Sequence, residues 1–295
     1  MVPSLTPAAR LYAYARLMRL DKPIGFFLLL WPVLWSLWLA AKGMPSIGNL
    51  IIFSLGALVM RSAGCVINDY ADRNFDGAVT RTKLRPLVLG HVSSREALGL
   101  FAGLCVLALL LVSFTNRLTI YLSAGALLLA MVYPFMKRYT YLPQVVLGAA
   151  FAWSIPMAFA AETGSVPPYA WLVYTAVVMW TTAYDTFYGM VDRDEDLKIG
   201  VKSTAILFAE QDRTMTACLQ GFFLIALWML GHKMALGWPF NLGLAAAAGL
   251  SAYQQWLIKE REPAACFQAF LHNNWVGMVI FLGIVAQFAL VIKPQ

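Results

Sequence analysis

Charged residues are scarce in this chain. Of its 295 residues, only 13% are charged and 60% are hydrophobic, whereas a soluble domain carries about 25% charged residues. A water-soluble protein of this length cannot bury that much apolar surface in one core. The composition therefore argues against a soluble enzyme and favours a membrane protein. The formal net charge of +7 does not indicate nucleic-acid binding, because the basic residues lie in short clusters between apolar runs.

Cysteine and histidine are also rare. The four cysteines form no CxxC pair, and the three histidines lie far apart along the chain. These spacings exclude a disulfide scaffold and give little support to a zinc or haem site. We expect the four thiols to be free.

Long apolar runs dominate what is present. A bilayer core requires about 20 apolar residues per helix, and nine stretches meet that length: 24–41, 48–68, 97–115, 118–136, 143–161, 169–189, 214–231, 238–257 and 274–292. We therefore predict an all-α polytopic membrane protein with about nine transmembrane helices, forming a single domain over residues 1–295. Residues 1–22 are expected to form an amphipathic helix in the membrane interface.

The distribution of Lys and Arg predicts the orientation of these helices. With the N-terminus in the cytoplasm, 18 of the 22 basic residues fall on the cytoplasmic side. The other four are Lys42, Arg117, Lys233 and Lys293. We therefore expect a cytoplasmic N-terminus and a periplasmic C-terminus, in a bacterial inner membrane. The two long polar connections, 69–96 and 190–213, then both face the cytoplasm.

Eight of the 15 acidic residues lie in two short segments, at the ends of the second and sixth apolar runs. Asp72 follows Asn68 by four positions and precedes Asp76 by four, and Asp192 and Asp196 have the same spacing. On a helix, this spacing places the side chains on one face. Oxygen ligands without His or Cys favour a hard cation, Mg²⁺ above all. Two such faces opposite each other would suit a diphosphate. The alternative is that these are solvated charges at helix ends.

Several segments together resemble the UbiA-type intramembrane prenyltransferases. Residues 68–76, NDYADRNFD, resemble the NDxxDxxxD signature of that family, and residues 184–203 resemble its second acidic signature. Residues 19–25 and 133–144 are similar to the branch that prenylates 4-hydroxybenzoate. The likeness covers nearly the whole chain.

The resemblance implies transmembrane helices around a central cavity, capped by the two cytoplasmic loops. It also implies a reaction in which a polyprenyl diphosphate loses diphosphate and the allylic carbon alkylates 4-hydroxybenzoate ortho to its hydroxyl, a step in ubiquinone synthesis. Mg²⁺ is the implied cofactor. The substrates and the lipid bilayer are the implied partners.

The roles expected at this site divide among three groups of residues. Two metal ions would be held by Asn68, Asp72, Asp76, Asp192 and Asp196. From the basic residues near the acids, which include Arg81, Lys83 and Arg85, we select Arg73 and Lys202 as diphosphate contacts. Arg138 is expected to bind the acceptor carboxylate, because its guanidinium can hold both oxygens. Asp185 is expected to support the phenol or the metal, and Asp69 to cap or salt-link the loop.

Two departures from the family pattern are visible. The loop reads RPLVLG at 85–90 where RPLPSG is frequent, and Glu195 stands where Asp is common. Two alternatives stay open at this point. One is a sibling prenyltransferase with another acceptor, such as homogentisate, dihydroxynaphthoate, haem or chlorophyllide. The other is a cation-coupled transporter, although its acids should lie near the middle of the membrane.

Overall fold

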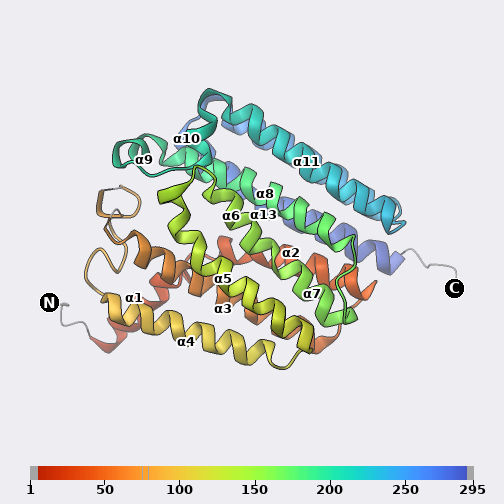
Figure 1. The fold of residues 1–295 in the computed structure, drawn as a ribbon. Coiled ribbons are helices and arrows are strands. Elements are labelled where there is room, and N and C mark those ends of the chain that lie inside the picture. Colours follow the sequence, from red (N-terminus) through yellow and green to blue (C-terminus); the bar gives the residue numbers. More distant parts are fainter. Residues whose placement is uncertain (1–5, 75, 79, 291–295) are drawn as a thin grey trace.

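The structure, a computed structural model, describes residues 6–74, 76–78 and 80–290. Every regular element in these ranges is a helix (Figure 1). The long helices are α2 (Ile24–Ala41), α3 (Ile47–Asp72), α4 (Ser94–Val112), α5 (Arg117–Tyr139), α8 (Ala170–Val191), α11 (Asp212–Lys233), α12 (Trp238–Leu257) and α13 (Pro263–Leu290). The shorter ones are α1 (Pro7–Leu17), η1 (Asp76–Ala78), α6 (Pro143–Ala152), α7 (Ser154–Thr163), α9 (Arg193–Ile199), α10 (Thr204–Phe208), η2 (Ala209–Gln211) and η3 (Ile258–Glu260).

Each of the nine predicted apolar stretches overlaps one or two helices within the described residues, which confirms the predicted fold class. Residues 291–292 of the last stretch lie outside the described residues. By length and hydropathy alone, seven helical segments of the described chain can cross a membrane. Two helices, α8 and α12, are not among them, so the count of nine is approximate. Both are nonetheless part of the bundle, because α8 packs on α11 and α12 packs on α13.

The predicted span at 143–161 is divided into α6 and α7 at Trp153. Pro156 lies in the first turn of α7 and has no N–H to donate to a carbonyl in the preceding turn. The two short helices therefore take the place of one continuous helix.

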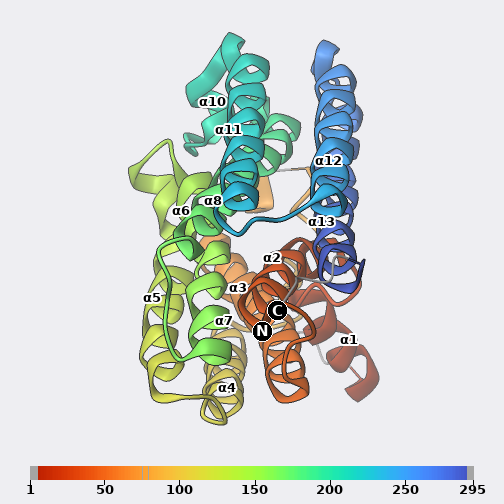
Figure 2. The ribbon, with the colours of Figure 1, turned by 90° about the vertical axis from the view of Figure 1, so that its right-hand side faces the viewer.

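Helix α8 lies near the centre of the bundle, in contact with α6, α11 and α13 (Figure 2). An aromatic stack fills the core around it: the Trp180 ring lies 5.3 Å from that of Trp35 and 5.8 Å from that of Phe223, measured between centroids. The Trp180 indole N–H donates to Asn273 Oδ1 at 2.8 Å. Because buried Trp N–H groups need a partner, this bond fixes α8 against α13.

Close approach of helices depends on glycine at two positions. A Cβ added at Gly148 would lie 2.9 Å from the carbonyl oxygen of Val178, and one at Gly243 would lie 2.8 Å from that of Val279. Both distances are shorter than real contacts allow. The pairs α6–α8 and α12–α13 therefore pack backbone to backbone, as small residues permit in membrane proteins.

The outer face of α4 and α5 is apolar and exposed. Val106, Leu110 and Leu128 have exposed fractions of 56%, 56% and 62%, and Tyr121 reaches 74%. Water does not favour such a surface, whereas lipid does. The arrangement agrees with an integral membrane protein. The four cysteines are free, as expected.

Helix α1 lies against the end of the bundle that carries the acidic segments (Figure 1). Ala13 and Leu17 are buried there against Val66, Val92 and Ala97. Leu11, on another face, is 69% exposed. The interfacial position predicted for residues 1–22 stays a prediction, and residues 1–5 lie outside the described part of the chain.

Candidate active site

The first acidic segment is a helix end followed by a turn. Helix α3 carries Asn68 and Asp72 and ends at Asp72, whereas Asp76 lies in the separate turn η1. The prediction of one continuous helical face through Asp76 is therefore wrong. The turn is held from within the same loop, since Thr82 Oγ1 donates to the Asp76 carbonyl at 2.8 Å and Arg85 Nη1 donates to Asp76 Oδ2 at 2.7 Å.

The second acidic segment follows the predicted geometry more closely. Asp185 lies in α8, Asp192 joins α8 to α9, and Asp196 lies one turn further on. The backbone N–H of Asp196 donates to the carbonyl of Asp192 at 2.8 Å. The two side chains therefore follow each other on one helical turn, as the four-residue spacing predicts.

The two segments meet at one end of the bundle, around a polar pocket of about 160 Å³. The residues of the predicted site that line it are Asn68, Asp72, Asp76, Asp185, Asp192, Asp196 and Lys202. Arg81, Arg85, Lys137 and Tyr188 are among the other polar residues of its wall. Residues more than 100 positions apart are thus brought together, as the resemblance implied.

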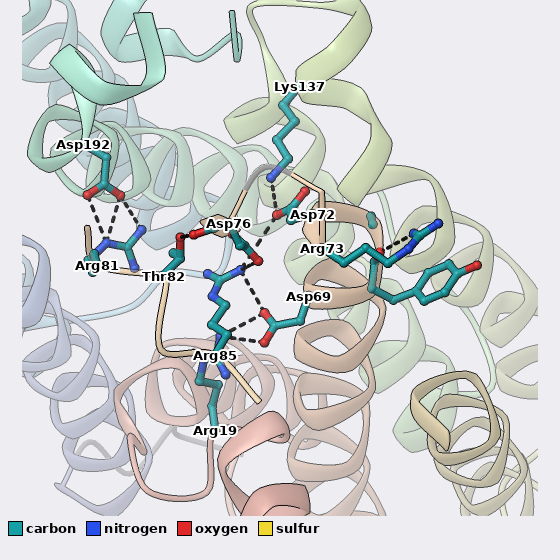
Figure 3. Close-up of polar contacts among 12 residues, drawn as sticks. Arg19, Asp69, Asp72, Arg73, Asp76, Arg81, Thr82, Arg85, Lys137 and Asp192 are labelled. Carbon is teal, nitrogen blue, oxygen red and sulfur yellow. Dashed lines mark hydrogen bonds and ion pairs between the residues drawn. The ribbon is translucent and has the colours of Figure 1, made fainter. Parts of the chain in front are cut away.

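Basic side chains pair with most of these carboxylates (Figure 3). Lys137 Nζ binds Asp72 Oδ2, Arg81 binds Asp192, and Arg85 binds Asp76. Asp69, only 1% exposed, accepts from Arg19 at 2.9 Å and from Arg85 at 3.0 Å. Asp69 therefore salt-links the loop to the helix preceding it, as expected, and the pocket contains fixed charges of both signs.

Two carboxyl groups of the pocket have strongly perturbed pKa values. Burial raises the pKa of Asp76 to about 6, and the negative charges of Asp72 and Asp69 act in the same direction, while Arg85 opposes them. Burial and the neighbouring Asp192 likewise raise the pKa of Asp196 to about 6. Crowded carboxylates of this kind gain from an added cation.

One carboxylate oxygen of the pocket is also available to a ligand. Asp72 Oδ1 is buried and accepts no hydrogen bond from any described residue. Oxygen donors, crowded carboxylates and this unpartnered atom fit a hard divalent cation. The described residues do not, however, bring three Asp, Glu, His or Cys side chains to one point that would close around a metal. Mg²⁺ is generally held by one or two carboxylates plus substrate phosphates, so a closed cluster is not required.

Two predicted site residues lie elsewhere. Arg73 is exposed, donates to the carbonyl of Tyr70 and stacks on its ring at 4.3 Å, so it points away from the pocket (Figure 3). Arg138 is exposed and donates to the carbonyl of Ala71, with its guanidinium 5.5 Å from the Phe135 ring. Neither side chain lines the pocket or the cavity, so the structure does not place Arg73 at the diphosphate site or Arg138 at an acceptor site. Arg81 and Arg85 pair with the acidic residues where Arg73 was expected nearby, and Lys137, the neighbour of Arg138, lines the pocket.

A large cavity of about 1120 Å³ opens from the polar pocket into the bundle. It extends to Phe151, Ser154 and Met157, deep between the helices. Six residues line both spaces and form their common boundary: Asn68, Arg81, Arg85, Tyr133, Asp185 and Tyr188. The arrangement places a charged pocket at the mouth of a mainly apolar chamber.

Arg61 is a functional candidate whose position in the sequence indicated only a cytoplasmic positive charge. It lines the cavity from α3, two turns before Asn68. Its Nη1 donates to Cys65 Sγ at 2.7 Å, while its buried Nε has no partner among the described residues. A Cβ at Gly25 would lie 2.3 Å from the guanidinium. Gly25 therefore leaves the space for the half-buried guanidinium of Arg61 beside the chamber.

The comparisons with known proteins agree with this geometry. A model described as the UbiA prenyltransferase family matches residues 29–281. The chain belongs to this family. The 4-hydroxybenzoate octaprenyltransferase of Saccharophagus degradans is 63% identical to it over 283 residues, which are 96% of this chain and 95% of the relative.

Solved structures of UbiA homologues share the fold. The apo homologue from Aeropyrum pernix K1 superposes with a TM-score of 0.78 at 24% identity, covering 88% of this chain and 97% of that chain. The homologue from Archaeoglobus fulgidus bound to GPP and Mg²⁺ has a TM-score of 0.72 at 18% identity, with coverages of 93% and 99%. At these identities the likeness establishes the fold of this UbiA-family chain.

Proposed function

We propose that this UbiA-family protein transfers a polyprenyl group from polyprenyl diphosphate to 4-hydroxybenzoate, ortho to the hydroxyl, and releases diphosphate in ubiquinone biosynthesis. The observation that carries the proposal is the polar pocket with both acidic segments on its wall, joined through six shared residues to a large apolar cavity. The relative named for this reaction, 63% identical over nearly the whole chain, supports the same acceptor.

The polar pocket is the proposed site for the diphosphate. Asn68, Asp72 and Asp76 on one side, with Asp192 and Asp196 on the other, would hold Mg²⁺. When bound, Mg²⁺ offsets the negative charge that develops on the departing diphosphate. Arg81, Arg85, Lys137 and Lys202 then bind the remaining phosphate oxygens. The guanidinium groups can do so in bidentate geometry.

The cavity is the proposed site for the prenyl chain and the acceptor ring. The allylic cation must be protected from water until the ring attacks it. Tyr133, Tyr184 and Tyr188 line the cavity near the polar pocket, together with Phe267 and Phe270. Aromatic faces stabilise a cation and exclude water at the same time.

Arg61 is the proposed partner of the acceptor carboxylate. An anion that enters an apolar cavity loses its hydration, and it binds only where a fixed cation compensates. Arg61 supplies that charge inside the chamber, whereas Arg138 lies outside it. Asp185, on the shared boundary, is then placed to accept a hydrogen bond from the phenol hydroxyl.

The topology proposed for this integral membrane protein follows the distribution of basic residues. The acidic segments and α1 lie at one end of the bundle, and the described end of α13 lies at the other (Figure 1). This arrangement suits a single domain whose N-terminal end and acidic loops face the cytoplasm, with the opposite end in the periplasm of a bacterial inner membrane.

An acceptor competition tests the proposed function. Membranes that contain the protein are incubated with Mg²⁺, a prenyl diphosphate and an equal mixture of 4-hydroxybenzoate, homogentisate and dihydroxynaphthoate, and the products are identified by mass spectrometry. We expect prenylated 4-hydroxybenzoate as the main product. Preferential prenylation of another acceptor would show that the acceptor assignment is wrong, and membranes with Asp192→Asn serve as the control for background activity.

A further inference from the structure

An ion-pair cluster around one buried carboxylate lies outside the pocket and the cavity, next to the second acidic segment. Its centre is Asp212, the first residue of α11, whose side chain is 0% exposed. Arg193 Nη1 donates to Asp212 Oδ2 at 2.8 Å, and Arg261 Nε lies 3.0 Å and 3.1 Å from the two carboxylate oxygens. The backbone N–H of Arg213 donates to Oδ1 at 2.7 Å. Both carboxylate oxygens are therefore fully engaged.

The cluster joins three separate turns of the chain. Arg193 begins α9 directly after Asp192, and its Nη2 also donates to the carbonyl of Ala209 at 2.9 Å. Arg261 lies between α12 and α13, and its Nη2 donates to the carbonyl of Glu210 at 2.7 Å. The start of α9, the start of α11 and the α12–α13 turn are thus tied to one carboxylate.

Two of these turns contain a residue with a positive φ, a backbone conformation that residues other than glycine rarely adopt. Ala209 has φ 45° and Arg261 has φ 58°. Residues persist in this region only where their surroundings hold them. The two arginine side chains provide such contacts, because each binds both the Asp212 carboxylate and a backbone carbonyl in the turn before α11.

Helix α9 depends on polar contacts for its position. Each of its seven residues, all of them described, is partly or fully exposed. Apolar burial therefore does not fix the helix. Its N-terminal end is held by Arg193, and Glu195 accepts from Thr80 Oγ1 at 2.7 Å at an exposed position. Exposed polar contacts contribute little, so the contact of Arg193 with the buried Asp212 carboxylate is the stronger of these two. Arg81 holds the preceding Asp192 from the pocket side.

We propose that Asp212, with Arg193 and Arg261, is a positioning cluster that sets the placement of Asp192 and Asp196 in the polar pocket. Arg193 follows Asp192 directly, but its guanidinium binds Asp212 outside the pocket wall. This attachment therefore sets how α9 is rotated about its axis. That rotation decides whether Asp196, one turn later, faces the pocket. In the described structure, the three residues of the cluster lie outside the walls of the pocket and the cavity.

The inference rests on the proposed function, because it takes Asp192 and Asp196 as metal ligands. Residues that orient metal ligands from behind generally change metal affinity or activity by about 10–100-fold when they are removed. The test therefore measures metal binding directly. Mn²⁺ binding to the purified full chain in detergent is followed by isothermal titration calorimetry, and the Mg²⁺ dependence of prenyl transfer is measured in parallel.

We expect Arg193→Ala to weaken Mn²⁺ binding and to raise the Mg²⁺ concentration for half-maximal activity by about tenfold or more. Arg193→Lys should recover part of both, since it keeps the charge but loses the second hydrogen bond. The KM for 4-hydroxybenzoate should stay unchanged. Arg213→Ala is the matched control, because it removes the same side chain at a position where only the backbone contacts Asp212.

Metal binding and Mg²⁺ dependence of Arg193→Ala equal to those of the unchanged protein would overturn the positioning role. So would a loss of kcat without any change in Mn²⁺ affinity. If Arg193→Ala fails to fold, the Mn²⁺ affinity and Mg²⁺ dependence of Arg193→Lys are compared with those of Arg213→Ala. Equal values for these two variants would then overturn the positioning role. A wild-type protein that neither binds Mn²⁺ nor requires Mg²⁺ would instead refute the proposed function.

Discussion

Lys137 Nζ forms an ion pair with the carboxylate of Asp72 across the polar pocket. This contact brings the end of α5 into a site whose acids lie at the ends of α3 and α8 and in the short elements η1 and α9 that follow them. Lys137 and its neighbour Arg138 have different partners, since Arg138 donates to the carbonyl of Ala71 and lines no part of the pocket. Helix α5 therefore adds a charge to a site that is otherwise formed by the two acidic segments and their loops.

The first prediction concerns the metal. Prenyl transfer should stop when membranes are treated with excess EDTA and should return with Mg²⁺ or Mn²⁺, because the pocket offers only hard oxygen donors. Product formation measured by mass spectrometry checks this. Full activity in membranes stripped of divalent metal would contradict it.

The second prediction concerns the carboxylates. Asp72→Asn or Asp192→Asn should each lower kcat by about 100-fold or more, because each keeps the shape but removes charge that compensates the diphosphate. Asp194→Asn should have little effect, since Asp194 is exposed and lies outside the pocket wall. Equal losses for Asp194→Asn and Asp192→Asn would contradict the assignment. Membrane levels of each variant are compared by immunoblot.

The third prediction separates two arginines. Arg61→Ala should raise the KM for 4-hydroxybenzoate by about tenfold or more, since an anion without a partner in the cavity is strongly disfavoured. The KM for the prenyl diphosphate should change less. Arg138→Ala is the matched control and should change neither constant strongly, because its side chain lies outside the cavity. The opposite pattern would restore Arg138 as the acceptor contact.

The fourth prediction concerns pH. The pKa of Asp76 and that of Asp196 are both raised to about 6 in the protein without metal. Below that pH the two groups bind protons, which compete with the cation. Mn²⁺ affinity without prenyl diphosphate should therefore fall as the pH is lowered from 7.5 to 5.5 and change little between 7.5 and 8.5. Calorimetric titrations at the three pH values test this, and equal affinity at 5.5 and 7.5 would contradict it.

The sequence was sufficient for the helices and for most of the acidic residues. Apolar runs of about 20 residues locate membrane spans without tertiary information. The prediction that Asp192 and Asp196 follow each other on one helical turn is confirmed because α9 begins directly after Asp192. The same spacing misleads at Asp76, since α3 stops at Asp72. Helix ends depend on loop contacts, here Thr82 and Arg85, that no local pattern shows.

The basic residues of the site were harder to predict. Adjacent residues on a helix differ by about 100° in direction, so the packing of α5 decides whether Lys137 or Arg138 faces inward. Arg61 lies within an apolar run, and the positive-inside rule explained its charge without a ligand. An arginine inside an apolar run, two turns before Asn68 on the same helix, was the available signal, and its meaning depended on the cavity beside it.

The boundary between the pocket and the cavity consists of only six residues. On the proposed assignment, the diphosphate and the prenyl chain therefore contact largely separate walls. Substitutions deep in the cavity, near Ser154 and Met157, would then alter the length of chain accommodated while leaving the polar pocket intact. Such a division lets chain-length preference change without change in the acidic residues, provided that the six boundary residues are kept.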